Sequence, residues 1–199
     1  MTDYLICGVD EAGRGPWAGP VCAGAVILDP DRPILGLTDS KKLSEKKRDQ
    51  LAIEVKSSAL SWALGWASPE EIDALNIRQA THLAMRRAIA GLSVVPSEIL
   101  IDGNDLPNDL PAQGRTIIKG DLTEPAISAA SILAKTARDT LMKDADLKHP
   151  GYGFAGHKGY GTKAHSEALS AMGPCPLHRM SFAPVRAAAR LTGSKRSAI

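Results

Sequence analysis

Two adjacent carboxylates followed by a glycine-arginine-glycine turn stand near the start of the chain. Close behind the apolar run 5–8, which is typical of a buried strand, come Asp10 and Glu11, then Gly13, Arg14 and Gly15. Carboxylates taken partly out of water repel each other and require a cation, a proton or hydrogen-bond donors. Glycine lets a ligand approach the backbone closely, because it has no side chain. The segment is therefore a candidate binding site for a divalent cation, next to a candidate binding site for a phosphate or sugar. The same residue types also form ordinary solvated turns.

The composition restricts the class of protein. The 199 residues, 44% of them hydrophobic, fit one domain with a small appendage. No run of about 18 apolar residues occurs and the N-terminus carries the acidic Asp3, so we predict neither a membrane span nor a signal peptide, and expect a cytoplasmic protein. Three cysteines without a CxxC pair (Cys7, Cys22 and Cys175) predict reduced thiols rather than disulfides or a thiolate zinc site.

The charge is distributed unevenly, although the net charge is only +2. Residues 158–199 hold seven Lys or Arg and a single acidic residue. A second basic cluster consists of Lys41, Lys42, Lys46, Lys47 and Arg48. Such clusters can follow a phosphate backbone, and they can equally be solvated helix faces.

Residue periodicity and turn signals predict an α/β fold. Strands are expected over 4–10, 21–28, 61–67, 99–101 and 116–118, with the first two forming a hairpin. Helices are expected over 45–58, from Pro69 onward, and over 76–90, 126–142, 162–172 and 183–191. This order indicates a mixed sheet flanked by helices, followed by a helical C-terminal part.

Carboxylates recur where the predicted strands end. They are Asp10 and Glu11 on the first strand, Asp102 after the fourth and Asp121 after the fifth. Hard oxygen ligands suit Mg²⁺ or Mn²⁺ better than zinc, and four of them can hold two ions about 4 Å apart for an in-line phosphoryl displacement. Neighbouring residues on a regular strand point to opposite faces, so Asp10 and Glu11 can share a site only if the strand ends or bends between them. Gly13 makes such a departure credible.

Other catalytic motifs are absent from the sequence. The glycines do not complete G-x-G-x-x-G or a phosphate-binding loop, no G-x-S-x-G occurs, and the five histidines lack HExxH spacing. Tyr160, between two glycines on a basic segment, can stack on a base or sugar, or simply pack over a turn. A non-catalytic nucleic-acid-binding module stays open as an alternative, while the aromatic content of 4% argues against a glycoside hydrolase.

With these residues assembled, the chain resembles bacterial ribonuclease HII, a type 2 ribonuclease H. Seven motifs carry the resemblance in order over residues 4 to 188: 10–15 (DEAGRG), 37–43 (LTDSKKL), 101–103 (IDG), 119–121 (KGD), 129–135 (AASILAK), 159–162 (GYGT) and 173–179 (GPCPLHR). The type 1 branch of ribonuclease H, a second alternative, shares the chemistry but not the glycine-arginine-glycine turn.

The resemblance implies a ribonuclease H-like catalytic domain at 1–145, a helical substrate-binding part at 146–192 and a mobile tail at 193–199. It implies cleavage of RNA in RNA–DNA hybrids, and cleavage on the 5′ side of single ribonucleotides in duplex DNA that leaves 3′-hydroxyl and 5′-phosphate ends. A monomer that contacts no membrane is expected.

The resemblance also implies roles for individual residues. Metal would be bound by Asp10, Glu11, Asp102 and Asp121. The ribose 2′-hydroxyl would be contacted by Gly13, Arg14 and Gly15, while Tyr160 would stack on the following deoxyribose and phosphate contacts are plausible for Lys41 and Lys42. Departures from the family pattern are Trp17, Ser128, Glu124-Pro125 and His157. None removes a proposed ligand, so they bear on substrate fit rather than on catalysis.

Overall fold

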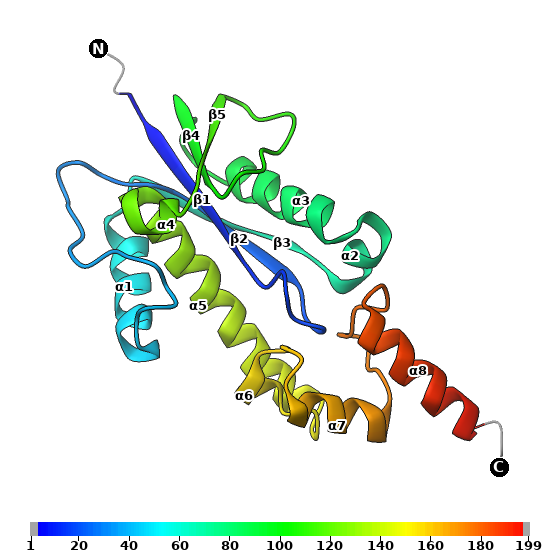
Figure 1. Ribbon diagram of the computed structural model, residues 1–199. Helices are drawn as coiled ribbons and strands as arrows, with labels where there is room; N and C mark the ends of the chain where they lie inside the picture. Colours follow the sequence, from blue (N-terminus) through cyan, green and yellow to red (C-terminus); the bar gives the residue numbers. More distant parts are fainter. Residues whose placement is uncertain (1–3, 197–199) are drawn as a thin grey trace. The chain divides into compact units, whose positions relative to one another are not determined.

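The structure is a computed structural model that describes residues 4–196. Its strands are β1 (Ile6–Ala12), β2 (Val21–Ile27), β3 (Ser61–Ala67), β4 (Glu98–Asp102) and β5 (Gln113–Ile117). Its helices are α1 (Glu45–Ser58), α2 (Pro69–Leu75), α3 (Ile77–Ala90), α4 (Gly120–Thr123), α5 (Pro125–Lys148), α6 (Phe154–His157), α7 (Lys163–Met172) and α8 (Ala183–Arg196). The sequence of strands and helices is traced in Figure 1.

The five strands form one mixed sheet in the order β3-β2-β1-β4-β5. β1 and β2 are antiparallel, with Ala12 opposite Cys22, which confirms the predicted hairpin. β4 runs parallel to β1, and β5 runs parallel to β4. The carboxyl ends of β1, β4 and β5 therefore lie at the same edge of the sheet.

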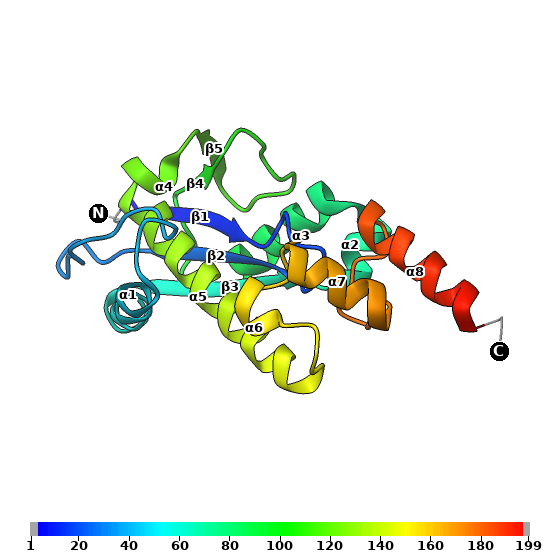
Figure 2. The ribbon, with the colours of Figure 1, turned by 60° about the horizontal axis from the view of Figure 1, so that its bottom comes forward.

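Two glycines let α5 lie directly on the sheet. A Cβ on Gly8 of β1 would lie 2.1 Å from the carbonyl carbon of Ala126, and a Cβ on Gly24 of β2 would lie 2.5 Å from the carbonyl oxygen of Ala130. α1 packs on the same face, where Leu51 joins a buried core with β2 and α5. Figures 1 and 2 show α1 and α5 on this side of the strands. The small residues at the start of α5 are thus needed for close packing.

The opposite face of the sheet is covered by α3. Trp62 and Leu64 of β3 pack into the core under α1, so Gly65 points the other way. A Cβ on Gly65 would lie 2.0 Å from the carbonyl oxygen of Ala84 in α3. The sheet therefore has helices on both faces, which confirms the predicted α/β class.

The chain divides into two compact units. The first consists of residues 1–12, 22–66 and 81–137 and contains most of the sheet; the second consists of 13–21, 67–80 and 138–199. The second unit has its own small cores, one around Phe154 and Met142 and one around Leu169 and Val185. The division at residue 145 stays a prediction about which parts catalyse and which bind substrate.

Several elements differ from the sequence-based expectation. β5 spans Gln113–Ile117 rather than 116–118, because an edge strand with one open side does not need an apolar sequence. α4 and α6 have four residues each and were not expected. α8 continues to Arg196, five residues beyond the prediction, while residues 197–199 of the predicted mobile tail lie outside the described residues. Within residues 4–196, no helix has the length and hydropathy to span a membrane.

Candidate active site

Asp10 and Asp102 lie level with each other at the carboxyl ends of neighbouring strands. Val9 is paired with Ile101 in the parallel ladder, so the residues that follow them stand side by side. Asp10 is on the same side of β1 as Gly8 and therefore faces α5. Its side chain is 6% exposed and accepts a hydrogen bond from the Ser131 hydroxyl of α5. The first and third predicted acids are thus brought together under one helix.

Asp121 joins this pair through its backbone. Lys119 has a left-handed conformation (φ 59°) that turns the chain from β5 into the short helix α4. The backbone N–H of Asp121 then donates to Oδ1 of Asp102 over 3.3 Å. Ser128 holds the same residue from the other side, because its hydroxyl donates to the Asp121 carbonyl over 2.8 Å. A serine that departs from the family pattern therefore helps to fix a proposed ligand.

The carboxylates of this cluster disfavour each other's charge. Burial raises the pKa of Asp10 well above its ordinary value, and the nearby carboxylates of Glu11 and Asp102 raise it further. Burial also raises the pKa of Asp121, followed by the repulsion of Asp102. Carboxylates held together in this way are stabilised by a divalent cation, and an all-oxygen donor set suits Mg²⁺ or Mn²⁺. The residues present therefore fit such an ion chemically.

Glu11 is placed differently from the other acids. The regular pairing of β1 with β2 continues through Glu11 and ends only at Ala12, so the expected bend between Asp10 and Glu11 is not there. The pleat consequently directs Glu11 away from the face that Asp10 and Asp102 share. Among residues 4–196, no three His, Cys, Asp or Glu side chains converge closely enough to hold a metal ion as they stand. For Glu11 to join the other three proposed ligands, the end of β1 would have to leave its regular pairing with β2.

The segment 37–43 supplies two further groups that face the cluster. Asp39 forms a side-chain hydrogen bond with Asp121 and raises its pKa, whereas the ammonium of Lys41 lowers it. Asp39 also shapes its own turn, because its Oδ1 accepts the Lys41 backbone N–H over 2.8 Å. Lys42 is exposed, and within residues 4–196 no ion pair or hydrogen bond joins its ammonium to these carboxylates. The phosphate contact expected of Lys41 stays a prediction, and sequence reasoning did not select Asp39, Ser128 or Ser131 as site residues.

The glycine-arginine-glycine turn lies in the second unit, beside Tyr160. Gly13 has φ +97°, and a Cβ there would lie 2.0 Å from Nε of Arg138, so this position requires glycine. Gly15 is different, because a Cβ there would meet only the Tyr160 ring, at 3.6 Å, which is ordinary contact. Tyr160 is 45% exposed. An open backbone position and an accessible aromatic ring are thus neighbours.

The loop that carries Tyr160 is held by the residues that depart from the family pattern. The backbone N–H of Trp17 donates to the Gly159 carbonyl over 2.8 Å, and its indole lies against Gly161, where a Cβ would be 2.1 Å from the ring. The ring of His157 stacks on that of His165, with centroids 4.3 Å apart, and accepts the Gly159 N–H at Nδ1 over 3.1 Å. Both departures are therefore packed into the loop rather than exposed.

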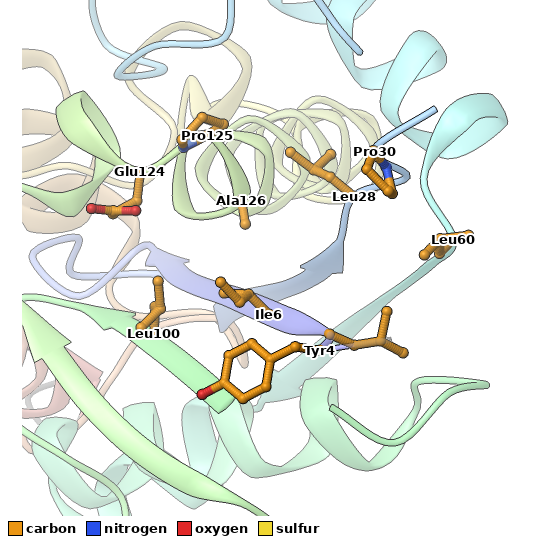
Figure 3. A pocket seen from close by; sticks show the side chains of 10 residues that line it. Tyr4, Ile6, Leu28, Pro30, Leu60, Leu100, Glu124, Pro125 and Ala126 are labelled. Carbon is orange, nitrogen blue, oxygen red and sulfur yellow. The ribbon is translucent and has the colours of Figure 1, made fainter. Parts of the chain in front are cut away.

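An apolar hollow of about 490 Å³ lies at the other end of β1 and does not belong to this site. Figure 3 shows its lining, in which Glu124 is the single charged side chain of ten. Ile6 is the first residue of β1 and Tyr4 lies just before it, whereas Asp10 and Glu11 are near the carboxyl end of the strand. The hollow offers no group suited to phosphodiester chemistry.

Comparison with known proteins decides between the remaining interpretations. The family model described as Ribonuclease HII matches residues 7–185. The chain belongs to the ribonuclease HII family. A Ribonuclease HII of Hyphomonas neptunium is 66% identical over 200 residues, covering 94% of this chain and 97% of that protein.

Solved structures agree with the fold. The ribonuclease H2 of Pyrococcus horikoshii OT3 has a TM-score of 0.82 at 25% identity, covering 94% of this chain and 97% of that chain. Bst-RNase HIII in complex with Mn²⁺ has a TM-score of 0.72 at 18% identity, covering 96% of this chain and 70% of that chain, and shows the fold alone.

Family membership confirms the predicted resemblance and the predicted class of enzyme. The chain is a ribonuclease H, a nuclease with ribonuclease H activity on RNA–DNA hybrids. The family depends on divalent metal ions and acts on nucleic acid. The ribonuclease H-like fold expected from the sequence is also confirmed.

Proposed function

We propose that this enzyme also nicks duplex DNA on the 5′ side of a single embedded ribonucleotide, leaving 3′-hydroxyl and 5′-phosphate ends. The observation that carries this proposal is the proximity of Gly15 to Tyr160, whose ring would lie 3.6 Å from a Cβ placed on Gly15. A backbone position open to a ligand stands next to an exposed ring, which suits the recognition of one sugar and the stacking of its neighbour. A nuclease that binds only continuous RNA–DNA hybrids along a groove does not need Gly15 and Tyr160 in this arrangement.

The proposed metal ligands are Asp10, Glu11, Asp102 and Asp121. Two Mg²⁺ or Mn²⁺ ions would activate a water molecule and stabilise the leaving oxygen of the phosphodiester. Ser131 orients Asp10 through its hydrogen bond, and the Asp121 backbone orients Asp102. The exposed ammonium of Lys41, close to Asp121, would contact a substrate phosphate, and Lys42 would do so further out.

Recognition of the ribonucleotide is assigned to the second unit. Gly13, Arg14 and Gly15 would contact the 2′-hydroxyl, and Tyr160 would stack on the deoxyribose that follows. Support comes from the exposure of Arg14 and Gly15 and from the tight packing that holds the Tyr160 loop. We further propose a cytoplasmic, monomeric enzyme.

The test uses four duplexes of one sequence: three differ only at a single sugar, which is ribose, 2′-deoxyribose or 2′-O-methylribose, and in the fourth one whole strand is RNA. The purified enzyme with Mg²⁺ or Mn²⁺ is expected to cut the first and the last and to leave the other two intact. Cleavage of the continuous hybrid without cleavage of the single-ribonucleotide duplex would reduce the function to hybrid hydrolysis. Cleavage of the all-DNA duplex would contradict sugar recognition altogether.

A further inference from the structure

A buried arginine is hydrogen-bonded to the backbone of the sugar-contacting turn. Arg179 is 0% exposed, and its Nη2 donates to the Gly13 carbonyl over 2.6 Å while Nη1 donates to the Arg14 carbonyl over 2.9 Å. Nε and Nη2 also donate to the Gly19 carbonyl, over 2.9 and 2.7 Å. One planar guanidinium thus binds both ends of the loop from Gly13 to Gly19.

A second buried guanidinium lies under the same loop. Arg138 is 1% exposed and donates to the carbonyl oxygens of Ala18 and Pro20, over 3.0 and 2.9 Å. Its Nη1 donates to the carbonyl of Lys158, two residues before Tyr160, over 3.0 Å. Burial, followed by the repulsion from Arg138, lowers the pKa of Arg179 to about 9, so Arg179 remains charged at neutral pH. Two like charges brought together out of water are unfavourable, and carbonyl dipoles compensate them here.

These bonds decide where the amide groups of the turn point. No cis peptide bond occurs among the described residues, and in a trans peptide the C=O and the following N–H point in opposite directions. Because Arg179 holds the carbonyls of Gly13 and Arg14 on the inner side, the N–H groups of Arg14 and Gly15 are turned to the outer side. Arg14 and Gly15 are exposed, and the Gly15 N–H has no hydrogen-bond partner within the described chain.

We propose that Arg179 is a positioning residue for sugar selection: by holding the Arg14 carbonyl inward, beside that of Gly13, it presents the amide N–H of Gly15 to the 2′-hydroxyl oxygen of a ribonucleotide. The inference rests on the proposed function, because it explains how the turn distinguishes ribose from deoxyribose. Arg179 itself touches no substrate. A hydroxyl oxygen accepts from an amide N–H, and a deoxyribose offers no such acceptor.

Lysine cannot replace Arg179 in this role. Its single ammonium has no planar fork and cannot bind two successive carbonyls and Gly19 in the same geometry. Arg179→Lys keeps a basic side chain of similar length and frees at least one carbonyl, so the peptide planes of the turn become free to rotate. The matched control is Arg186→Lys, since Arg186 is exposed on α8 and donates to the Ser181 carbonyl.

Binding is measured without cleavage in an Asp10→Asn background, with a single-ribonucleotide duplex and an all-DNA duplex of the same sequence. We expect Arg179→Lys to lower the preference for the ribonucleotide duplex about tenfold, consistent with the loss of one or two hydrogen bonds, and to change all-DNA affinity less than twofold. Arg186→Lys should preserve the preference. An unchanged preference, or an equal loss of affinity for both duplexes, would overturn the proposal.

A second measurement needs no change at Arg179 and tests the outward orientation of the turn, on which the role of Arg179 depends, even if that variant does not fold. Amide hydrogen exchange at Gly15 in the Asp10→Asn protein should be fast when the protein is free, and slowed at least roughly tenfold more by the ribonucleotide duplex than by the all-DNA duplex. Slow exchange in the free protein, or equal protection by both duplexes, would overturn the outward orientation.

The two proposals can fail separately. If the Asp10→Asn protein itself binds both duplexes equally, the proposed sugar recognition fails. If it prefers ribose and Arg179→Lys keeps that preference, only the role of Arg179 fails.

Discussion

The Nε2 atoms of His165 and His178 lie 3.0 Å apart in the interior of the second unit. Nδ1 of His178 accepts the Cys175 backbone N–H over 3.0 Å, and Nδ1 of His165 lies 2.9 Å from the Tyr160 carbonyl. All three hydrogen bonds form when both rings are neutral. His165 then donates from Nδ1 to the Tyr160 carbonyl, and His178 donates from Nε2 to Nε2 of His165. The pair therefore links the segment at Cys175 to the loop that carries Tyr160.

Acid should break this link. Burial, followed by the repulsion of His165, lowers the pKa of His178 to about 4, and burial lowers the pKa of His165 as well. The unfolded chain then binds more protons than the folded one between about pH 6.5 and pH 4, so this stability is present above pH 6.5 and is lost as the pH falls. For His178 the loss at pH 5 is about 2 kcal/mol.

Urea unfolding at pH 7.5 and pH 5 measures this effect, with His178→Gln as the reference that does not titrate. The wild-type protein should lose more stability between the two pH values than the variant does. The comparison also removes the opposite contribution of Asp10 and Asp121, whose raised pKa values favour the fold at low pH and are common to both proteins. Equal losses would show that the histidine pair does not control acid stability.

Replacement of Asp10 by asparagine should separate binding from catalysis. The amide keeps the shape of the side chain and removes one of the charges that would hold the metal ions. We expect the cleavage rate to fall at least roughly a thousandfold, equivalent to about 4 kcal/mol of transition-state stabilisation, while hybrid binding stays within about threefold. Single-turnover cleavage and equilibrium binding give the two numbers. Retained cleavage would remove Asp10 from the metal site.

Tyr160→Ala should affect the two substrates unequally. Stacking of an aromatic ring contributes about 1 to 3 kcal/mol, and the ring lies beside the turn that is proposed to contact the ribose. We expect kcat/KM on the single-ribonucleotide duplex to fall at least tenfold more than on the continuous hybrid, and Tyr160→Phe to keep most of the activity on both. Equal losses on the two substrates would count against a role for Tyr160 at the junction.

Gly8→Ala should destabilise the first unit, because its methyl group would meet the backbone of α5 at 2.1 Å and push the helix from β1. Overpacking of this kind lowers the free energy of unfolding by about 3 kcal/mol. The matched control is Gly156→Ala, since no atom lies within 4 Å of the position its methyl group would take. Denaturant titration should show a large loss for the first and a change within about 1 kcal/mol for the second. Similar values would contradict the direct packing of α5 on β1.

Local signals predicted much of the fold. Ser44 accepts the Lys47 N–H at the start of α1, and Ser68 forms a capping box with Glu71 at the start of α2, as their sequences indicate. The predicted bounds of β5 were wrong because this segment is a strand through its pairing with β4 rather than through its own hydrophobicity. α4 depends on the left-handed Lys119, and no propensity marks that residue.

From the sequence, the candidate metal ligands could be predicted only because acidic residues recur where the strands end. Asp10 and Asp102 come together because β1 and β4 are parallel neighbours, whereas the sequence predicted only that both acids lie where strands end. The contacts that hold the site come from distant parts of the chain: Arg179 is 165 residues from Arg14, and Ser131 is 91 residues from Ser40, its hydroxyl partner. Serine and arginine in helices and loops are ordinary surface residues, so only the folded structure reveals that these are buried and paired.

The most direct measurement is the position and chemistry of the cut in duplex DNA that contains one ribonucleotide, with the purified enzyme and Mg²⁺ or Mn²⁺. We predict a single nick on the 5′ side of the ribonucleotide with 3′-hydroxyl and 5′-phosphate ends, and no cut in the matched all-DNA duplex. An intact ribonucleotide duplex, or a nick on the 3′ side of the ribonucleotide, would contradict recognition of the sugar by the Gly13–Gly15 turn and Tyr160.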